Sequence, residues 1–398
     1  MVTFIHAADL HLDTPFSGLK ELSPHWKARL QAAPYQALDK IVETAISKQV
    51  DFVIFAGDIY DQAVRGFKAQ MAFLNALKQL ECANIPIFVI FGNHDYAKNT
   101  LTDVQFPENV HIFNSGKVTT AFYQTSCGEK VALSGFSYAA RHEVREMIEE
   151  FPLRSDEVDY HIGIYHGQIG HAGDAYAPFQ VTAMQQKHYN YWALGHIHQR
   201  QFLATNPPIV YSGTTQGRHA LEVGEKGIYH VTLSHDSAPQ LEFLPTQSLQ
   251  FENITLTIEE ESPSISAITE AIKKFMHSQK EDTLYRMLLK FKHLKHSDSI
   301  PIMRSRAWRE HLNETLLKNN QCIVDLQLKI EKNETLLGRL MAHYPNELAK
   351  TEYKVIDDDI FLNLASDLTD KYHIPHRDFL DISYRRELLE KARTKLSE

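Results

Sequence analysis

The chain has 398 residues and carries 41 Lys and Arg against 50 Asp and Glu, a formal net charge of −9. Its length predicts two or three domains, and its ordinary composition (43% hydrophobic, 23% charged) excludes a wholly disordered chain. No apolar run reaches the ~18 residues of a membrane helix, and no secretory signal is apparent, so we expect no membrane association. Three scattered cysteines exclude a disulfide framework and favour a cytoplasmic location. The negative charge argues at first against a nucleic-acid partner.

The first half of the chain predicts strands that alternate with helices. We expect strands over residues 2–7, 51–56 and 85–91, with helices over 34–48 and 67–81 between them. Because these strands are continuously apolar, the sheet that they form should be covered on both faces. Further strands, less regularly spaced, indicate a second sheet packed on the first, a β-sandwich flanked by helices. They are expected at 110–113, 118–123, 130–136, 160–165, 190–194, 209–211 and 227–233.

The character of the chain changes near residue 245, beyond which glycine is scarce. A strand over 251–258, a helix over 265–277 and an alternating strand over 284–291 predict a small separate α+β domain. From residue 304 onward we expect a mostly helical, highly charged region. The predicted domains are therefore 1–245, 246–300 and 301–398.

Five short polar motifs follow predicted strands in the first domain. Ligands of α/β sheets gather at the carboxyl ends of strands, so we expect these motifs to meet. Most of them, taken alone, are more often ordinary loops, but five in this order favour one shared site. Their Asp, Asn and His side chains suffice for two metals if one carboxylate bridges, and this mixture suits Mn, Fe or Zn better than Ca or Mg. The motifs are Asp9-Leu10-His11, Gly57-Asp58, Gly92-Asn93-His94-Asp95, Tyr165-His166-Gly167 and Gly195-His196-Ile197-His198.

These motifs resemble those of the calcineurin-type metallophosphoesterases. Residues 4–13 and 55–61 resemble more closely the SbcD-type subunit of DNA-repair nucleases, and the resemblance extends over residues 1–235. Gln216-Gly217-Arg218-His219 and Glu222-x-Gly224-x-Lys226-Gly227 indicate the YhaO-like branch of that group. The resemblance implies an α/β fold: a four-layer metallophosphoesterase β-sandwich flanked by helices, with a small α+β cap domain that holds DNA and a helical C-terminal region.

The resemblance also implies a role for each motif residue. His94 would face the phosphate and assist the leaving oxygen, while Asp61 would orient His94 and keep it charged. The alternative for Asp61 is a surface carboxylate. Two divalent metals, most consistent with Mn and alternatively Fe or Zn, would generate the hydroxide that attacks phosphorus. One metal would be held by Asp9, His11, Asp58 and His198, and the other by Asp58, Asn93, His166 and His196, with Asp58 bridging.

Other polar side chains of the first domain have two interpretations each. Arg218 could contact a phosphate or pair with Glu222. His171 and Asp174 could approach substrate, although a solvent-exposed loop is the favoured interpretation. His6 lies within the first strand and is expected to be a buried, hydrogen-bonded core residue.

The net charge is unevenly distributed along the chain. Residues 273–309 contain ten basic and three acidic residues, a net charge of +7. Alternation along the strand predicted there would place Arg286, Lys290 and Lys292 on one face, where they could follow a DNA backbone. An ordinary solvated face of a small domain is an equally good interpretation.

The function favoured by the sequence is a dimetal phosphodiesterase that hydrolyses DNA, as an exonuclease or endonuclease in repair. One alternative is a phosphatase or small-molecule phosphodiesterase on the same fold. The other is an assembly subunit for an SbcC/Rad50-like ATPase, which would be YhaN-like in this branch and a separate chain. An amphipathic helix predicted over 376–396 could dock on that ATPase or pack on its own domain. A homodimer remains open.

Overall fold

The structure, a computed structural model, describes residues 1–16, 19, 22–61, 66–96, 105–260, 263–292, 299–330 and 390–391. The chain divides into two compact units. The first comprises Met1–Ile254, Lys273–Met287 and Arg306–Leu326. The second comprises Thr255–Ile272, Leu288–Ser305 and Gln327–Glu398. All the motif residues of the sequence analysis therefore belong to the first unit.

The first sheet has six strands in the order β12-β11-β1-β2-β3-β4. Neighbours from β1 to β4 run parallel, whereas β11 and β12 pair in antiparallel fashion at the other side. Strands β1, β2 and β3 are buried along almost their whole length, as their continuous apolar sequence predicts. The strands are β1 (Val2–Ala7), β2 (Phe52–Ala56), β3 (Ile87–Ile90), β4 (Val110–Ile112), β11 (Gly227–Leu233) and β12 (Gln240–Pro245).

The second sheet also has six strands, in the order β5-β6-β7-β8-β10-β9. Its central strands β6, β7, β8 and β10 run parallel, and each edge strand is antiparallel to its neighbour. The two sheets pack face to face, because side chains such as Phe4 and Ile54 meet Ile162 and Ala193 in one apolar cluster. The strands are β5 (Thr119–Gln124), β6 (Lys130–Gly135), β7 (Tyr160–His166), β8 (Tyr191–Gly195), β9 (Gln201–Thr205) and β10 (Pro208–Tyr211).

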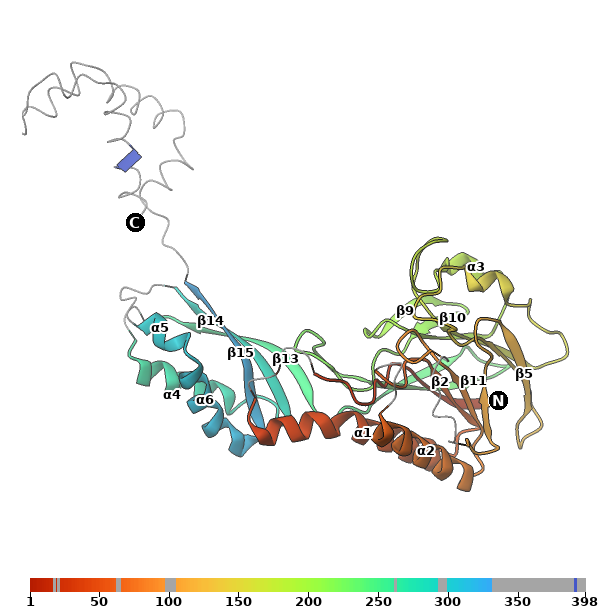
Figure 1. Cartoon of the computed structure of the whole chain (residues 1–398), viewed down its shortest axis with the longest axis horizontal. Helices are drawn as coiled ribbons and strands as arrows, with labels where there is room; N and C mark the ends of the chain where they lie inside the picture. Colours follow the sequence, from red (N-terminus) through yellow and green to blue (C-terminus); the bar gives the residue numbers. More distant parts are fainter. Residues whose placement is uncertain are drawn as a thin grey trace, which may run out of the picture. The chain divides into compact units, whose positions relative to one another are not determined.

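Helices cover the outer faces of both sheets. Helices α1 (Pro24–Ser47) and α2 (Phe67–Cys82) lie side by side on the first sheet (Figure 1), where they pack on alternate strand residues such as Ile5. The short helix α3 (Val181–Gln185) and the 3-10 turn η2 (Met147–Glu150) cover the second sheet. The result is four layers with two sheets inside, which confirms the predicted α/β fold class.

Helix α1 begins ten residues earlier than the pattern over 34–48 predicts. The Oγ of Ser23 caps it by accepting a hydrogen bond from the Trp26 backbone N–H at 3.5 Å, and Pro24 occupies the first turn, where its missing N–H costs nothing. The added turns bury Trp26 and Leu30 against Phe251. Pro34, which resembles a helix start in the sequence, lies inside the helix.

Two strands of the sandwich, β9 and β12, do not appear among the predicted elements. Both are edge strands, and their residues are mostly exposed or half-buried. An edge strand with one wet face carries no continuous apolar run, so it lacks the signal on which the other strands were recognised.

The second half of the chain forms a third sheet, in the order β13-β14-β15. The expectation of a mostly helical region from residue 301 is wrong for residues 321–330, which form β15, and the predicted boundary at 300 separates elements of one sheet. Apolar residues alternate at 322, 324, 326, 328 and 330, a period of two that identifies a strand. The elements are β13 (Gln250–Ile258), α4 (Ile265–Met276), β14 (Thr283–Phe291), α5 (Ser299–Met303), α6 (Arg306–Leu316), η3 (Leu317–Asn319) and β15 (Gln321–Ile330).

None of the described helices combines the length and the apolar character that a membrane-spanning segment requires. The amphipathic helix expected over 376–396 lies outside the described residues, apart from residues 390 and 391.

Candidate metal centre

The polar motifs that follow β1, β2, β3, β7 and β8 meet at one edge of the sandwich. The backbone N–H of His196, after β8, donates to both carboxylate oxygens of Asp9, after β1, at 3.0 and 3.1 Å. The backbone N–H of Asp9 in turn donates to the carbonyl oxygen of Gly57 at 3.1 Å. All seven predicted ligands lie in one cluster that joins the two sheets, because groups of their ligand atoms lie within 4.8 Å of one another and Asn93 contacts His166 and His196.

The backbone at this edge is strained and tightly packed. Asp9, His11, Asp58 and His196 have φ angles of 52°, 44°, 51° and 99°, in a region that costs a non-glycine residue about 1–3 kcal/mol. Gly57, at φ 92°, cannot be replaced without a clash, because a Cβ there would lie 2.4 Å from the Nδ1 atom of His166. Such strain is typical of functional loops whose side-chain directions matter more than local stability.

One half of the cluster brings together four side-chain atoms, from His166, Asn93, Asp58 and His196, that are able to act as acceptors. The Nδ1 of His166 lies 2.9 Å from the carbonyl oxygen of Ala56, which can only accept, so Nδ1 carries the proton and Nε2 is bare. That bare Nε2 lies 3.1 Å from Oδ1 of Asn93 and 3.3 Å from Oδ2 of Asp58. The Nδ1 of His196 approaches the same Asn93 oxygen at 3.0 Å. Converging lone pairs of this kind fit a bound cation.

The other half of the cluster repeats this arrangement with different supports. The Nε2 atoms of His11 and His198 lie 3.0 Å apart. The Nδ1 atom of His198 lies 2.6 Å from Oε1 of Glu222, and Nδ1 of His11 lies 3.2 Å from Oδ1 of Asp61. Since carboxylates accept, Nδ1 of His198 carries the proton and its Nε2 faces that of His11 as a lone pair, while Nδ1 of His11 lies beside the Asp61 carboxylate without a hydrogen bond to it. Together with Asp9 these groups suit a second cation.

Asp58 stands between the two halves of the cluster. Its Oδ2 atom lies 3.3 Å from Nε2 of His166 and 3.7 Å from Nε2 of His11, while its Oδ1 accepts a hydrogen bond from the His94 backbone N–H at 2.9 Å. Asp58 is buried, and a single carboxylate in this place can serve both halves. The centre as a whole thus fits two divalent metal ions.

The pKa values of the cluster indicate that its buried carboxylates are stabilised by positive charge nearby. Burial alone would lower the pKa of His166, but the carboxylates of Asp58 and Asp9 raise it to about 9. Burial would raise the pKa of Asp58, but the neighbouring histidines hold it well below its usual value. Burial lowers the pKa of His196 to about 3. The buried carboxylates of the cluster therefore favour a positively charged partner, which a bound cation would supply.

His94 lies at the open side of the cluster, and its orientation differs in one respect from the prediction. Its Nδ1 donates to the backbone carbonyl oxygen of Asp61 at 2.8 Å, whereas the Asp61 carboxylate is 3.9 Å away. Asp61 therefore holds His94 through its main chain. The side chain of His94 is 34% exposed, while those of His11 and His166 are fully buried, so solvent reaches His94 more easily than either of them.

The contacts of Arg218 include Glu222, one of its two predicted partners, and also Asp61, which was not predicted. Its guanidinium donates to the carboxylate of Asp61 and to the Oγ1 atom of Thr14, the latter at 3.1 Å. Its pairing with Glu222 involves the backbone N–H, at 2.6 Å, and not the side chain. The guanidinium is therefore engaged within the centre, which leaves a direct phosphate contact by Arg218 without structural support.

Two carboxylates support the centre although the sequence analysis gave them no role there. Asp95 is buried and accepts backbone hydrogen bonds from Ile59 at 2.6 Å, Tyr60 at 3.1 Å and Gly92 at 2.7 Å, so it ties the loop after β2 to the loop after β3. Glu222 holds His198. Asp95 belongs to the Gly-Asn-His-Asp motif, and that position was the available signal. Only the fold brings Glu222 to His198.

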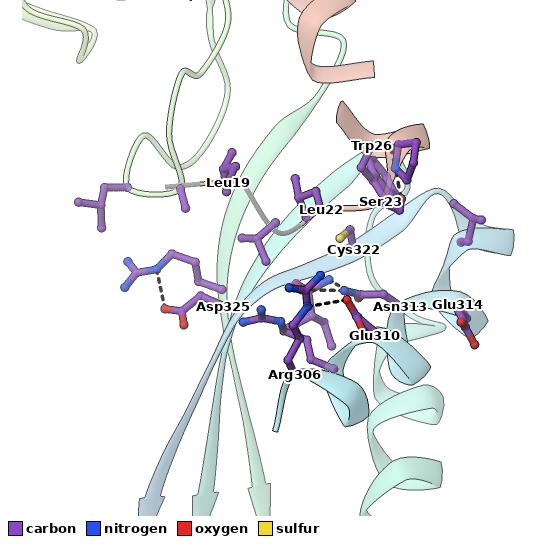
Figure 2. Close-up of a pocket in the computed structure, with 18 residues that line it drawn as sticks. Leu19, Leu22, Ser23, Trp26, Arg306, Glu310, Asn313, Glu314, Cys322 and Asp325 are labelled. Atoms are coloured by element: carbon purple, nitrogen blue, oxygen red, sulfur yellow. Dashed lines mark hydrogen bonds and ion pairs between the residues drawn. The ribbon is translucent and has the colours of Figure 1, made fainter. Parts of the chain in front are cut away.

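A cavity of about 780 Å³ lies within the first unit and contains none of the predicted metal ligands. Figure 2 shows Leu22 and Trp26 on one wall and Arg306 and Glu310 on the other. Three arginines line the cavity together with three carboxylates, and Arg306 Nε donates to Glu310 at 2.7 Å. The cavity is therefore balanced in charge, which does not favour a phosphate site.

The predicted basic strand face is partly neutralised by local pairs. Arg286, which lines the cavity, has its Nε atom 3.5 Å from Oδ2 of Asp325, and the Nζ atom of Lys292 lies 2.6 Å from Oε1 of Glu259. The burial of β14 alternates from residue 285 onward, as predicted, with Arg286 and Lys290 half-buried. Arg286 and Lys290 are thus placed on the strand as expected, and Lys292 directly follows it, but Arg286 and Lys292 have carboxylate partners.

The remaining polar residues agree with their structural interpretations. His6 is fully buried, with Nδ1 2.9 Å from the Tyr191 hydroxyl and Nε2 3.2 Å from the carbonyl oxygen of Leu194. His171 and Asp174 are exposed and close a turn on each other, since the His171 backbone N–H donates to the Asp174 carboxylate at 2.9 Å.

Comparison with known proteins agrees with this centre. The model of the calcineurin-like phosphoesterase family matches residues 2–200. The "Uncharacterized metallophosphoesterase YhaO" of Bacillus subtilis is 40% identical over 240 residues, which cover 58% of this chain and 58% of that protein's length. Proteins named "DNA double-strand break repair protein Mre11" are also similar. That of Thermoplasma acidophilum is 26% identical over 263 residues (62% of this chain, 67% of that protein), and that of Methanococcus maripaludis 24% over 352 (84% and 91%).

The matched region contains β1 to β8 and every residue of the metal-ligand set. A family of this kind hydrolyses phosphoester bonds with the help of bound metal, and the converging acceptors described above fit that chemistry. The chain belongs to the calcineurin-like phosphoesterase family.

Proposed function

We propose that this chain is a dimetal-dependent phosphodiesterase that hydrolyses DNA. The observation that carries the proposal is the position of Asp58 between two sets of bare acceptor atoms, with His94 at the open side. Asp9, His11 and His198 would hold one metal, and Asn93, His166 and His196 the other, with Asp58 shared. When bound, two divalent cations, with Mn the first choice, would counter the phosphate charge and activate the attacking water.

The chain's own residues would orient the substrate and move one proton. His94 donates its Nδ1 proton to the carbonyl oxygen of Asp61, so its Nε2 is the atom left for the substrate. In its protonated form His94 would donate from Nε2 to the leaving oxygen, a step that contributes about 10²–10⁴-fold in comparable enzymes. The hydrogen bond to the Asp61 carbonyl oxygen fixes the orientation of the His94 ring and does not neutralise the charge of the protonated imidazole.

DNA is the proposed substrate because the named relatives that span most of the chain are DNA-repair proteins. The Mre11 protein of Methanococcus maripaludis aligns with 84% of this chain, so the similarity extends well beyond the half that the family model matches. An excess of basic residues in 273–309 supports the same substrate. A separate SbcC/Rad50-like ATPase partner and a cytoplasmic location form part of the proposal.

A phosphodiesterase of small molecules is the second candidate, and one observation favours it. Arg286 and Lys292 pair with Asp325 and Glu259, so fewer positive charges are available to a polyanion than the sequence suggests. A small substrate would need only the metal centre and His94.

Hydrolysis of a defined oligonucleotide and of bis(p-nitrophenyl) phosphate, measured in parallel, tests the proposal. The wild-type protein should cleave both in Mn²⁺ and neither in EDTA, with kcat/KM higher for DNA. Replacing His94→Ala should lower kcat on both substrates by about 10²–10⁴-fold while metal content stays at two per chain. Faster turnover of the small diester would favour the second candidate, and hydrolysis that persists in EDTA would contradict the metal dependence.

A further inference from the structure

The two halves of the metal centre are supported by groups of different charge. On one side the outer nitrogen of His166 donates to a backbone carbonyl, while the Nδ1 atom of His196 faces Asn93, which is itself a predicted ligand of that half. On the other side the outer nitrogens of His11 and His198 both face carboxylates. A carboxylate behind a metal-binding histidine fixes the ring and raises its basicity, whereas a carbonyl does so less strongly.

Arg218 links the two carboxylates of the charged half. Its backbone N–H donates to Oε2 of Glu222 at 2.6 Å, and its guanidinium donates to Oδ1 of Asp61. Glu222 and Asp61 are each less than a tenth exposed, at 9% and 8%. One residue therefore holds both the carboxylate that accepts from His198 and the carboxylate that lies beside His11, although those histidines follow β-strands of different sheets.

The loop that carries Arg218 and Glu222 is itself fixed to the sandwich. Gln216 is buried, donates through Nε2 to the Leu249 carbonyl oxygen at 2.7 Å and accepts at Oε1 from the Ser248 backbone N–H at 3.0 Å. Thr214 donates to the carbonyl oxygen of Asp9 at 2.7 Å. The loop is thus tied to a predicted ligand of the same half, so its carboxylate is presented at a defined place.

We infer that Glu222, Arg218 and Asp61 form a support that sets the metal affinity of one position only, the one made by Asp9, His11 and His198. Glu222 and Asp61 are positioning residues, because they act through the histidines. The inference rests on the proposed dimetal function and deepens it: the two positions are unequal, and the carboxylate-backed one depends on a loop far along the chain from either histidine.

Metal content and spectroscopy of the full chain test this inference without reference to activity. Wild-type protein equilibrated with Mn²⁺ should bind two ions per chain in two distinguishable steps, with the electron paramagnetic resonance signal of a coupled pair. Glu222→Gln keeps the shape of the side chain and removes its charge. It should weaken one binding step by about 10–100-fold and leave the other unchanged, so that a mononuclear signal appears at limiting Mn²⁺.

Two further variants serve as controls for Glu222→Gln. Glu225→Gln removes an exposed carboxylate of the same loop and should leave both binding steps unchanged. Asp61→Asn acts on His11 instead of His198 and should weaken the same step as Glu222→Gln. It gives a second measurement should Glu222→Gln fail to fold.

The double variant of Glu222→Gln and Asp61→Asn separates the outcomes. Retention of one firmly bound ion in that protein supports the inference, because both changes act on one position. Loss of both ions, or unchanged affinity in either single variant, overturns it. If the wild-type protein binds two ions but does not cleave DNA, the proposed substrate fails and the inference about the two positions stands.

Discussion

The edge of the sandwich that carries the predicted metal ligands and strand β14 both contain charged side chains that the sequence singled out. The surroundings of those side chains differ between the two regions. At the metal edge, residues from β1, β2, β3, β7 and β8 turn toward a common point, and acceptor atoms meet acceptor atoms. On β14 the basic residues remain near the surface, and Arg286 and Lys292 pair with carboxylates.

The difference teaches which arrangement of charge indicates function. Groups of like character that are buried together without a compensating partner cost free energy unless a ligand supplies the missing charge, so their convergence implies one. A basic side chain that has already found a carboxylate at the surface is satisfied, and its presence implies little.

The largest effect is expected from Asp58→Asn. Because Asp58 lies between both halves of the centre, an amide there should weaken both metal positions and reduce hydrolysis to the level of the EDTA-treated protein. Elemental analysis after dialysis should find fewer than two metal ions per chain. Asp236→Asn, at an exposed site, is the matched control. A variant at Asp58 that retains two metals and full activity would contradict the shared role.

His6 offers an intermediate effect, since it is a buried histidine of β1 outside the metal cluster. Burial lowers its pKa from 6.5 to about 3, so between those values the unfolded chain binds a proton that the folded chain does not. Stability should therefore fall as the pH decreases from about 6.5 toward 3, with a slope from this group of up to about 1.4 kcal/mol per pH unit.

Urea unfolding of the wild-type protein and of His6→Gln over that pH range measures this slope. The variant should lose stability less steeply, whatever its stability at neutral pH. Parallel curves for the two proteins would show that His6 does not titrate as its burial implies.

The smallest effect is expected from reversing the charges on β14 to glutamate at Arg286, Lys290 and Lys292. Among the described residues Lys290 pairs with no carboxylate, so we expect about one phosphate contact to be lost rather than three. The slope of log affinity for DNA against log salt should then change by about 0.9, and not by about 2.7. Hydrolysis of bis(p-nitrophenyl) phosphate serves as the control and should stay unchanged. A change of about 2.7 in the slope would instead support the DNA-binding role that the sequence predicts for all three basic residues.

Most of the sandwich was predictable from periodicity. Strands β1, β2 and β3 and helix α2 lie within a residue or two of their predicted bounds, because a strand buried on both faces must be continuously apolar. The edge strands β9 and β12 were not predictable in this way, since half of each faces water. Strand β15 carried a clear alternation, but its charged residues made it resemble the helices around it.

The candidate site divides along similar lines. The ligand set and His94 follow from short motifs, because neighbouring backbone fixes where each side chain points. Glu222 behind His198, and the guanidinium of Arg218 on Asp61, join residues that are 24 and 157 positions apart. No local pattern records such a pairing, so the sequence analysis named Glu222 as a partner of Arg218 but not Asp61.

The sequence by itself determined the family, the layered α/β architecture and the residues able to bind two metals. These features depend on local hydrophobic period and on residue types at strand ends, both of which act over a few positions. The tertiary structure alone decided how each residue is supported: His94 through a carbonyl, His11 and His198 through carboxylates, and Arg286 through Asp325. Support of this kind depends on distances across the folded sheets, which only packing sets.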